Sequence, residues 1–146
     1  MKERITLGSF EVVSLPLLGM NREVAKVDTG AYSGALHCTG IKVVRRGENK
    51  TRILKYVPND DMKLATETSD FKETYVRSAT GHRLKRYIIN TKIEIHGVSY
   101  NITIGLSDRS DLKRPILIGR RFLRENNFLV DVQTNQEYDD EWENSK

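Results

Sequence analysis

An aspartate followed by threonine and glycine stands at the end of an apolar run near the N-terminus, where residues 27–31 read Val-Asp-Thr-Gly-Ala. Because Asp28 closes a strand-like run and opens a turn, we expect its carboxylate to be held rigidly and to face a cleft. Gly30 permits a backbone conformation and a close approach that a side chain would block. Thr29 can anchor the turn through its hydroxyl. The tripeptide makes Asp28 a candidate catalytic acid, although an ordinary strand-to-turn connection can contain the same three residues.

One such carboxylate is insufficient for the chemistry that it suggests. Hydrolysis of a peptide bond without a metal ion or a covalent intermediate needs one carboxylate to activate water and one carboxylic acid to protonate the carbonyl. Two carboxyl groups about 3 Å apart share a proton and supply both roles. The chain has 146 residues and a single Asp-Thr-Gly, too little for two lobes. A twofold homodimer would bring two copies of Asp28 together on its axis, so the chemistry predicts dimerisation.

The elements that must position Asp28 are expected to be strands and turns. Strand-like runs lie at residues 5–18, 23–28, 41–44, 51–57, 73–77, 84–90, 91–96, 98–106, 115–119 and 128–132. Residues 78–82 (Ser-Ala-Thr-Gly-His) predict the tip of a β-hairpin, and Gly97 predicts the turn of another. The polar segment 58–70 is interpreted as a loop and residues 120–126 as a short helix. These elements indicate an all-β fold.

Composition sets limits on the class of protein. Hydrophobic residues make up 38% and charged residues 30%, which suits one modest core. We expect one domain over residues 1–134 and an acidic, flexible tail over 135–146. The single cysteine, Cys38, excludes an intrachain disulfide and fits a reducing compartment. With neither a signal peptide nor a membrane-length apolar run, we expect a cytoplasmic protein without membrane contact. The net charge of +4 is too modest for a nucleic-acid binder.

Three blocks of the chain follow one another in an order that is known from a protein family. The first is residues 27–37, which fit the pattern Val-Asp-Thr-Gly-Ala-x-x-Ser-Ala-Leu-His with a small shift around 33–34. The second block is the hairpin, with Arg77, Gly81-His82 and Arg86-Tyr87. The third is the C-terminal block, with Asp108-Arg109, 115–123 and 129–131. From about residue 10 to 132, the chain resembles the retropepsin family of aspartic peptidases. More closely, it resembles the bacterial family often labelled "ATP-dependent zinc protease", whose members are similar to retropepsin-like peptidases found beside RimK-type glutamate ligases.

The resemblance implies a closed acid-protease barrel of about six strands with one short helix near 120–126, acting as a homodimer. It implies an aspartic-type peptidase in which Asp28, Thr29 and Gly30 form the catalytic turn and the hairpin around 79–81 is a flap over the substrate. Gly119 and Arg120 would support that turn. The family commonly has an acid where this chain has Tyr32, so the usual ion pair of Arg120 cannot form here.

The same resemblance gives the hairpin a role in binding a peptide or protein substrate. The residues concerned are Arg77, Gly81, His82 and Arg86. Basic residues on a hairpin usually form only a solvated face. Arginine forks also recognise carboxylates, and related proteins are associated with glutamate-rich peptides, so an acidic substrate is a further hypothesis.

A metal or cofactor is not predicted, despite the label of the family. Candidate zinc ligands are His37, Cys38, His82 and His96, but no His-Glu-x-x-His, Cys-x-x-Cys or phosphate-binding loop is present. We interpret His37 as a hydrogen-bonded structural residue, Cys38 as a small buried residue and Asp131 as a structural residue at a strand end. A catalytically silent peptide-binding module and a zinc-dependent hydrolase remain the alternative functions.

Overall fold

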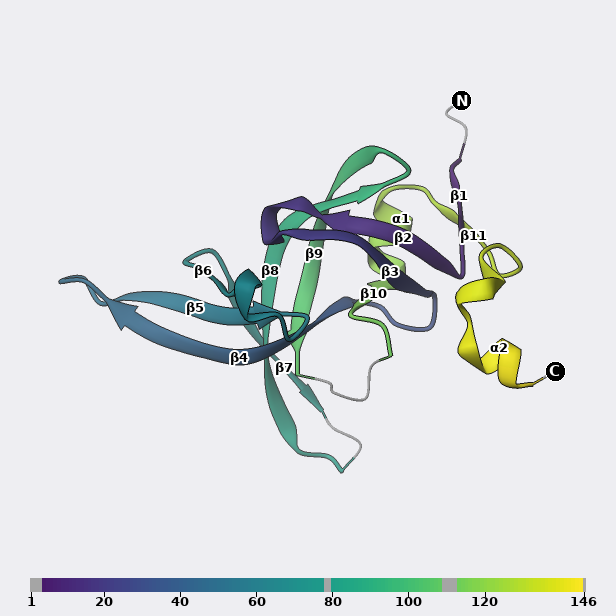
Figure 1. Cartoon of the computed structure of the whole chain (residues 1–146). Coiled ribbons are helices and arrows are strands. Elements are labelled where there is room, and N and C mark those ends of the chain that lie inside the picture. Colours follow the sequence, from purple (N-terminus) through teal and green to yellow (C-terminus); the bar gives the residue numbers. More distant parts are fainter. Residues whose placement is uncertain (1–3, 78–79, 109–112, 146) are drawn as a thin grey trace.

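The computed structural model describes residues 4–77, 80–108 and 113–145, which form eleven strands, two α-helices and three short 3-10 helices (Figure 1). The strands are β1 (Thr6–Gly8), β2 (Phe10–Leu15), β3 (Met20–Asp28), β4 (Gly34–Arg46), β5 (Thr51–Pro58), β6 (Thr66–Thr68), β7 (Lys72–Arg77), β8 (Arg83–Ile95), β9 (Val98–Ser107), β10 (Ile116–Gly119) and β11 (Leu129–Asp131). The α-helices are α1 (Arg120–Glu125) and α2 (Asp140–Asn144). The predicted all-β class with one short helix after the apolar strand is confirmed.

Six strands close on themselves into a barrel. Their order is β10, β3, β2, β8, β9 and β4, and β4 then pairs with β10. β10 therefore lies between β3, to which it runs parallel, and β4, to which it runs antiparallel. Because β3 and β4 follow one another along the chain, the segment that joins them must pass over the end of β10. That segment contains Thr29 and Gly30.

The alternation of side chains along β8 explains how the barrel encloses a core. From Ile89 onward, buried side chains alternate with the exposed Asn90, Lys92 and Glu94, since successive side chains of a strand point to opposite faces. The most completely buried large side chains are Leu7, Val13, Leu15, Met20, Leu36, Leu54, Ile93, Ile95, Ile104, Ile116 and Ile118. This apolar interior makes the barrel wall rigid and fixes the end of β3, where Asp28 lies.

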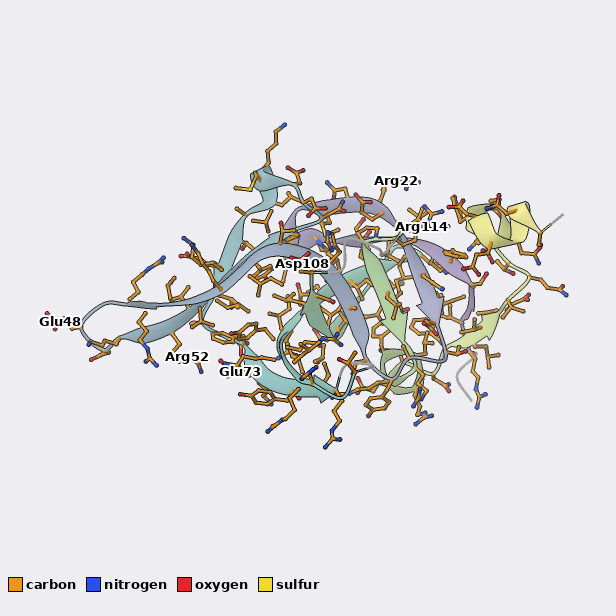
Figure 2. All side chains as sticks on the ribbon, turned by 90° about the horizontal axis from the view of Figure 1, so that it is seen from below. Arg22, Glu48, Arg52, Glu73, Asp108 and Arg114 are labelled. Atoms are coloured by element: carbon orange, nitrogen blue, oxygen red, sulfur yellow. The ribbon has the colours of Figure 1, made fainter. Side chains whose placement is uncertain are left out.

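Two hairpins project from the barrel in different directions (Figure 1). One joins β4 to β5, and Glu48 lies at its tip (Figure 2). The other joins β7 to β8, the predicted flap hairpin. An ion pair between Arg52 of β5 and Glu73 of β7 connects the two hairpins (Figure 2).

The boundaries of several elements differ from the prediction. The expected strand at 41–44 is part of a longer strand that begins at Gly34, because β9 and β10 both pair with its first residues. The expected runs 84–90 and 91–96 form one continuous strand, β8, which pairs with β7 over its first half and with β9 from residue 87 onward. The interpretation of 58–70 as a loop was incomplete, since residues 66–68 pair with β5 as the short strand β6.

The C-terminal segment folds against the barrel. Residues 136–138 form a 3-10 turn that leads into α2. The Asn135 side chain donates a hydrogen bond of 2.6 Å to the carbonyl of Phe10. The predicted boundary at residue 134 and the flexibility of the tail stay predictions.

Candidate active site

The turn that carries Asp28 crosses the end of β10 at very short range. Gly119 of β10 lies opposite Asp28 in the parallel pairing. A Cβ atom on Gly119 would lie 2.6 Å from the carbonyl oxygen of Tyr32, and one on Gly34 would lie 2.7 Å from the carbonyl oxygen of Leu117. Only residues without a side chain allow backbones to approach so closely. The two glycines therefore make this crossing possible.

Backbone hydrogen bonds then fix the turn. The amide of Gly30 donates to Asp28 Oδ1 at 2.9 Å, and the amide of Ala31 donates to the Asp28 carbonyl at 3.3 Å. The first amides of a helix lack partners within that helix. In α1 these are the amides of Arg120 and Arg121, which donate to the carbonyls of Ala31 and Tyr32 at 2.8 and 3.0 Å. The start of α1 thus holds the Asp28 turn in place.

Arg120 supports the same turn with its side chain. Its Nη1 donates to the carbonyl of Gly30 at 3.1 Å, and its guanidinium carbon lies 5.4 Å from the centre of the Tyr32 ring. Tyr32 therefore takes the place of the acid that the resemblance led us to expect. A cation–π contact replaces an ion pair.

The anchoring role that the sequence predicted for the Thr29 hydroxyl stays a prediction. Thr29 is exposed. Within the described residues, its hydroxyl makes no hydrogen bond with the turn, which is held by the amides of Gly30 and Ala31 and by Arg120.

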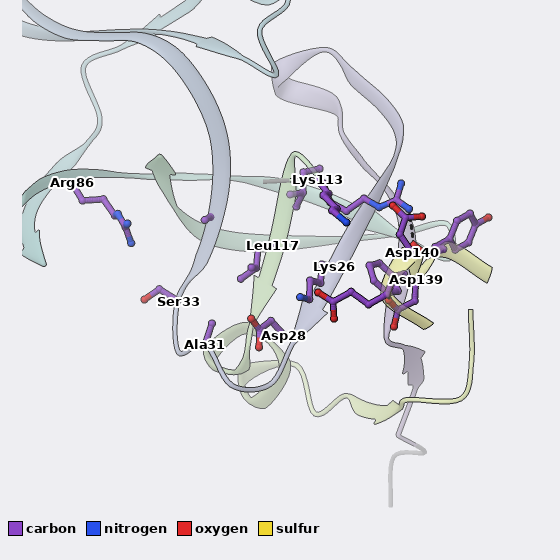
Figure 3. Close-up of a pocket in the computed structure, with 15 residues that line it drawn as sticks. Lys26, Asp28, Ala31, Ser33, Arg86, Lys113, Leu117, Asp139 and Asp140 are labelled. Atoms are coloured by element: carbon purple, nitrogen blue, oxygen red, sulfur yellow. Dashed lines mark hydrogen bonds between the residues drawn. The ribbon is translucent and has the colours of Figure 1, made fainter. Parts of the chain in front are cut away.

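Asp28 is half-buried and opens into a cavity of about 450 Å³ (Figure 3). The strands, the 113–117 segment and the C-terminal segment all contribute to its lining, which consists of Phe10, Lys26, Asp28, Ala31, Ser33, Ala35, Arg86, Lys113, Arg114, Ile116, Leu117 and residues 138–141. A second cavity of about 170 Å³ lies between α1 and the β7–β8 hairpin. Ser33 and Arg86 line both cavities, so the space beside Asp28 continues toward the hairpin.

The structure brings only one of the four predicted substrate-binding residues into these cavities. Arg86 lies with Asp28 in the larger one. Arg77, Gly81 and His82 lie near the exposed tip of the hairpin, where Gly81 has a φ of 84° that suits glycine in the turn. Residues 78 and 79 of the predicted flap tip lie outside the described residues.

Sequence reasoning missed three cations that line the Asp28 cavity: Lys26, Lys113 and Arg114. Lys26 could have been found, since it lies two residues before Asp28 on one strand and therefore points to the same face. Lys113 and Arg114 precede β10 in a segment with no regular pattern. They reach the cavity only because β10 lies beside β3.

The candidate zinc ligands are dispersed. His37 is buried, and its Nε2 lies 2.9 Å from Asp60 Oδ2, while His96 contacts Glu11 at 3.0 Å. Within the described residues, no three histidine, cysteine or acidic side chains come together as metal ligands. The donor set therefore does not fit a zinc ion, which needs three or four such ligands. His37 is the hydrogen-bonded residue that the sequence predicted.

Two further residues have the structural character that was predicted. Burial raises the pKa of the Cys38 thiol to about 12, with smaller contributions from the carboxylates of Asp60 and Asp108. Asp131, at the end of β11, accepts hydrogen bonds from the amide of Gln133 at 2.9 Å and the hydroxyl of Thr134 at 3.1 Å. Neither residue lines the Asp28 cavity.

Comparison with known proteins places this geometry in a family. A model of the RimB-like family, described as retropepsin-like aspartic endopeptidase RimB, matches residues 6–140. Proteins named probable alpha-L-glutamate ligase from Shewanella pealeana and Parasynechococcus marenigrum are 28% and 30% identical over 131 and 123 residues. These matches cover 88% and 82% of this chain but only 28% and 26% of those relatives, so the chain spans about a quarter of their length.

A solved structure shares the fold. The Legionella pneumophila protein Lpg0085, of unknown function, superposes with a TM-score of 0.65 at 23% identity, over 90% of this chain and 95% of that protein. Among the described residues, no helix is long and apolar enough to cross a membrane. The family match over nearly the whole chain agrees with the crossing of the Asp28 turn over β10, and the chain belongs to the RimB-like family of retropepsin-like aspartic endopeptidases.

Proposed function

We propose that this protein is an aspartic peptidase, and that a homodimer holds the attacking water between its two Asp28 carboxylates. The observation that carries the proposal is the position of Asp28, on a backbone-fixed turn that opens into a cavity. A rigid carboxylate keeps its alignment with water and substrate, and such positioning supplies a large part of a catalytic rate.

The chemistry needs a second carboxyl group, which a second copy supplies. One carboxylate takes a proton from water while the oxygen attacks the carbonyl carbon, and the protonated partner donates its proton to the carbonyl oxygen. As the C–N bond breaks, the carboxyl group that took the water proton donates it to the leaving nitrogen. The other carboxylate takes back a hydroxyl proton, so the pair again shares one proton. Thr29 and Tyr32 are exposed beside Asp28. A second copy whose Asp28 approaches within about 3 Å would cover this surface.

Acidic peptides are the substrate class that the cavity favours. Its cationic side chains are Lys26, Arg86, Lys113 and Arg114. Cations that converge in a partly enclosed space attract carboxylates more strongly than cations on an open surface. The relatives named as glutamate ligases suggest glutamate-containing peptides as the first substrates to test.

The test compares cleavage of glutamate-rich and neutral peptides by mass spectrometry. We expect Asp28→Asn to abolish cleavage, a chelator to leave it unchanged, and Asp131→Asn to serve as the matched control, since Asp131 holds only the end of β11. Cleavage that persists in Asp28→Asn would refute the proposal. Cleavage lost to a chelator and restored by zinc would favour a metal-dependent hydrolase.

Mixing subunits tests the shared site. In an equal mixture of wild-type and Asp28→Asn chains that exchange freely, about one quarter of the dimers keep two carboxylates. The mixture should therefore have about a quarter of the activity of wild-type protein at the same total concentration of chains. If each subunit acted alone, half of the activity would remain, and the proposed dimeric site would be wrong.

A further inference from the structure

The acidic segment that follows β11 forms one wall of the cavity that contains Asp28. Residues 138–141 (Tyr-Asp-Asp-Glu) line this cavity together with Asp28 and Lys26. In Figure 3, Asp139 and Asp140 lie on the side of the pocket where Lys26 and Lys113 lie, away from Arg86. The chain thus places its own acidic segment in the wall of the proposed substrate cavity.

The contact is held by a hydrogen bond to the peptide backbone. Nη2 of Arg114 donates to the carbonyl oxygen of Tyr138 at 2.6 Å, and the guanidinium carbon of Arg114 lies 5.7 Å from the centre of the Phe10 ring. A guanidinium that binds a main-chain carbonyl can bind the carbonyl of any peptide, because this group is common to all residues.

The charges in the cavity follow a simple division. The four cationic side chains belong to the barrel and to the segment before β10: Lys26, Arg86, Lys113 and Arg114. Apart from Asp28, the carboxylates that line the cavity come from Asp139, Asp140 and Glu141. If the C-terminal segment left, the cavity would keep its cationic side chains and lose three of its four carboxylates. That arrangement would suit an acidic peptide in place of the segment.

On the basis of the function proposed above, we propose that residues 138–141 are an intramolecular competitor of the substrate. They occupy a subsite for acidic residues formed by Lys26, Lys113 and Arg114, and they must leave before an acidic peptide can bind there. A tethered segment acts at an effective concentration in the millimolar range, so weak contacts suffice for it to compete. Asp140 and Glu141 are exposed, which is consistent with a segment that can detach.

The test measures binding rather than cleavage, so that its failure differs from failure of the proposed function. In the Asp28→Asn background, a fluorescent glutamate-rich peptide is titrated and its anisotropy gives Kd. The test variant combines Asp139→Asn, Asp140→Asn and Glu141→Gln. Asn at 139 can still accept the hydrogen bond that the amide of Glu141 donates to the Asp139 side chain at 3.1 Å. We expect Kd to fall about fivefold or more, because the cavity wall loses three carboxylates that compete with the peptide for the field of its cations.

A matched control separates this effect from net charge. It combines Glu48→Gln, Asp70→Asn and Glu137→Gln, three exposed acidic residues that do not line the cavity. Glu48 lies at the far tip of its hairpin, well away from Arg114 (Figure 2). Both variants gain three units of positive charge, so equal changes in Kd would overturn the inference. Weaker binding by the test variant would overturn it too, because the segment would then be part of the binding wall. Absence of peptide binding in every variant would also overturn the inference.

Displacement can also be observed directly. When saturating peptide displaces the segment, the backbone amides of residues 138–141 should exchange with solvent deuterium faster, as followed by mass spectrometry. Bound peptide with unchanged exchange of these amides would refute displacement. If binding responds as expected but the wild-type protein cleaves nothing, the competitor stands and the peptidase proposal fails.

Discussion

The close crossing at Gly119 yields a quantitative prediction. In Gly119→Ala, the new methyl group would lie 2.6 Å from backbone atoms of Tyr32 and Ser33. An ordinary contact between such atoms is about 3.5 Å, so the turn must withdraw by roughly 1 Å. Overpacking of this kind costs about 1–3 kcal/mol of stability. A displacement of about 1 Å at a catalytic group costs about a hundredfold in rate.

Two measurements test this expectation. Urea unfolding should give a lower midpoint for Gly119→Ala, and kcat/KM on a glutamate-rich peptide should fall about a hundredfold at a temperature where the variant is folded. The control is Ile95→Val. Ile95 is fully buried and pairs with Val13, which in turn pairs with Glu23 of β3, away from the Asp28 end of that strand.

The control should lose about 1 kcal/mol of stability and keep its activity. The reasoning fails if Gly119→Ala retains wild-type stability and kcat/KM. It also fails if Ile95→Val loses activity to the same extent, because the loss would then follow from stability alone.

Two further predictions concern Arg120 and Cys38. Arg120→Lys keeps the charge but loses the planar guanidinium that contacts Gly30 and Tyr32. Urea unfolding should therefore show a free energy of unfolding lower by about 1 kcal/mol, and peptide assays a roughly tenfold lower kcat/KM. Arg124→Lys, exposed on the same helix, should change neither quantity. Because burial raises the pKa of Cys38 from 9.0 to about 12, its contribution to stability is complete below pH 9.0 and is lost as the pH rises toward about 12, by on the order of 4 kcal/mol. Urea unfolding across this range should show a smaller decline for Cys38→Ala, and an equal decline would contradict the assignment.

Local patterns predicted the elements of the fold well. The apolar run at 115–119 followed by a helix appears as β10 and α1, since a continuous apolar run suits a strand buried on both faces. The turn at Gly97 appears with positive φ at both His96 and Gly97, as a two-residue hairpin turn requires. These features depend on neighbouring residues, which a sequence displays directly.

The features that sequence reasoning missed depend on contacts between distant residues. Arg120 contacts Gly30 across 90 positions of the chain, and its partner ring, Tyr32, replaces an expected acid. Lys113 reaches the Asp28 cavity through the pairing of β10 with β3. The acidic tail reaches it through the hydrogen bonds of Asn135 to Phe10 and of Arg114 to Tyr138. Propensity and periodicity describe one segment at a time, so they cannot give the register of such a pairing.

The rigidity and the completeness of the proposed site have separate physical origins. Rigidity arises within one chain, from the amides of α1, the guanidinium of Arg120 and the close approach at Gly119. In the mechanism that we propose, completeness requires a second chain, because each copy contributes one Asp28. Substitutions at Gly119 or Arg120 should therefore lower stability and activity together. Asp28→Asn should lower activity without a comparable loss of stability and should inactivate wild-type partners in mixed dimers. A site contained within one subunit could not inactivate its partner in this way.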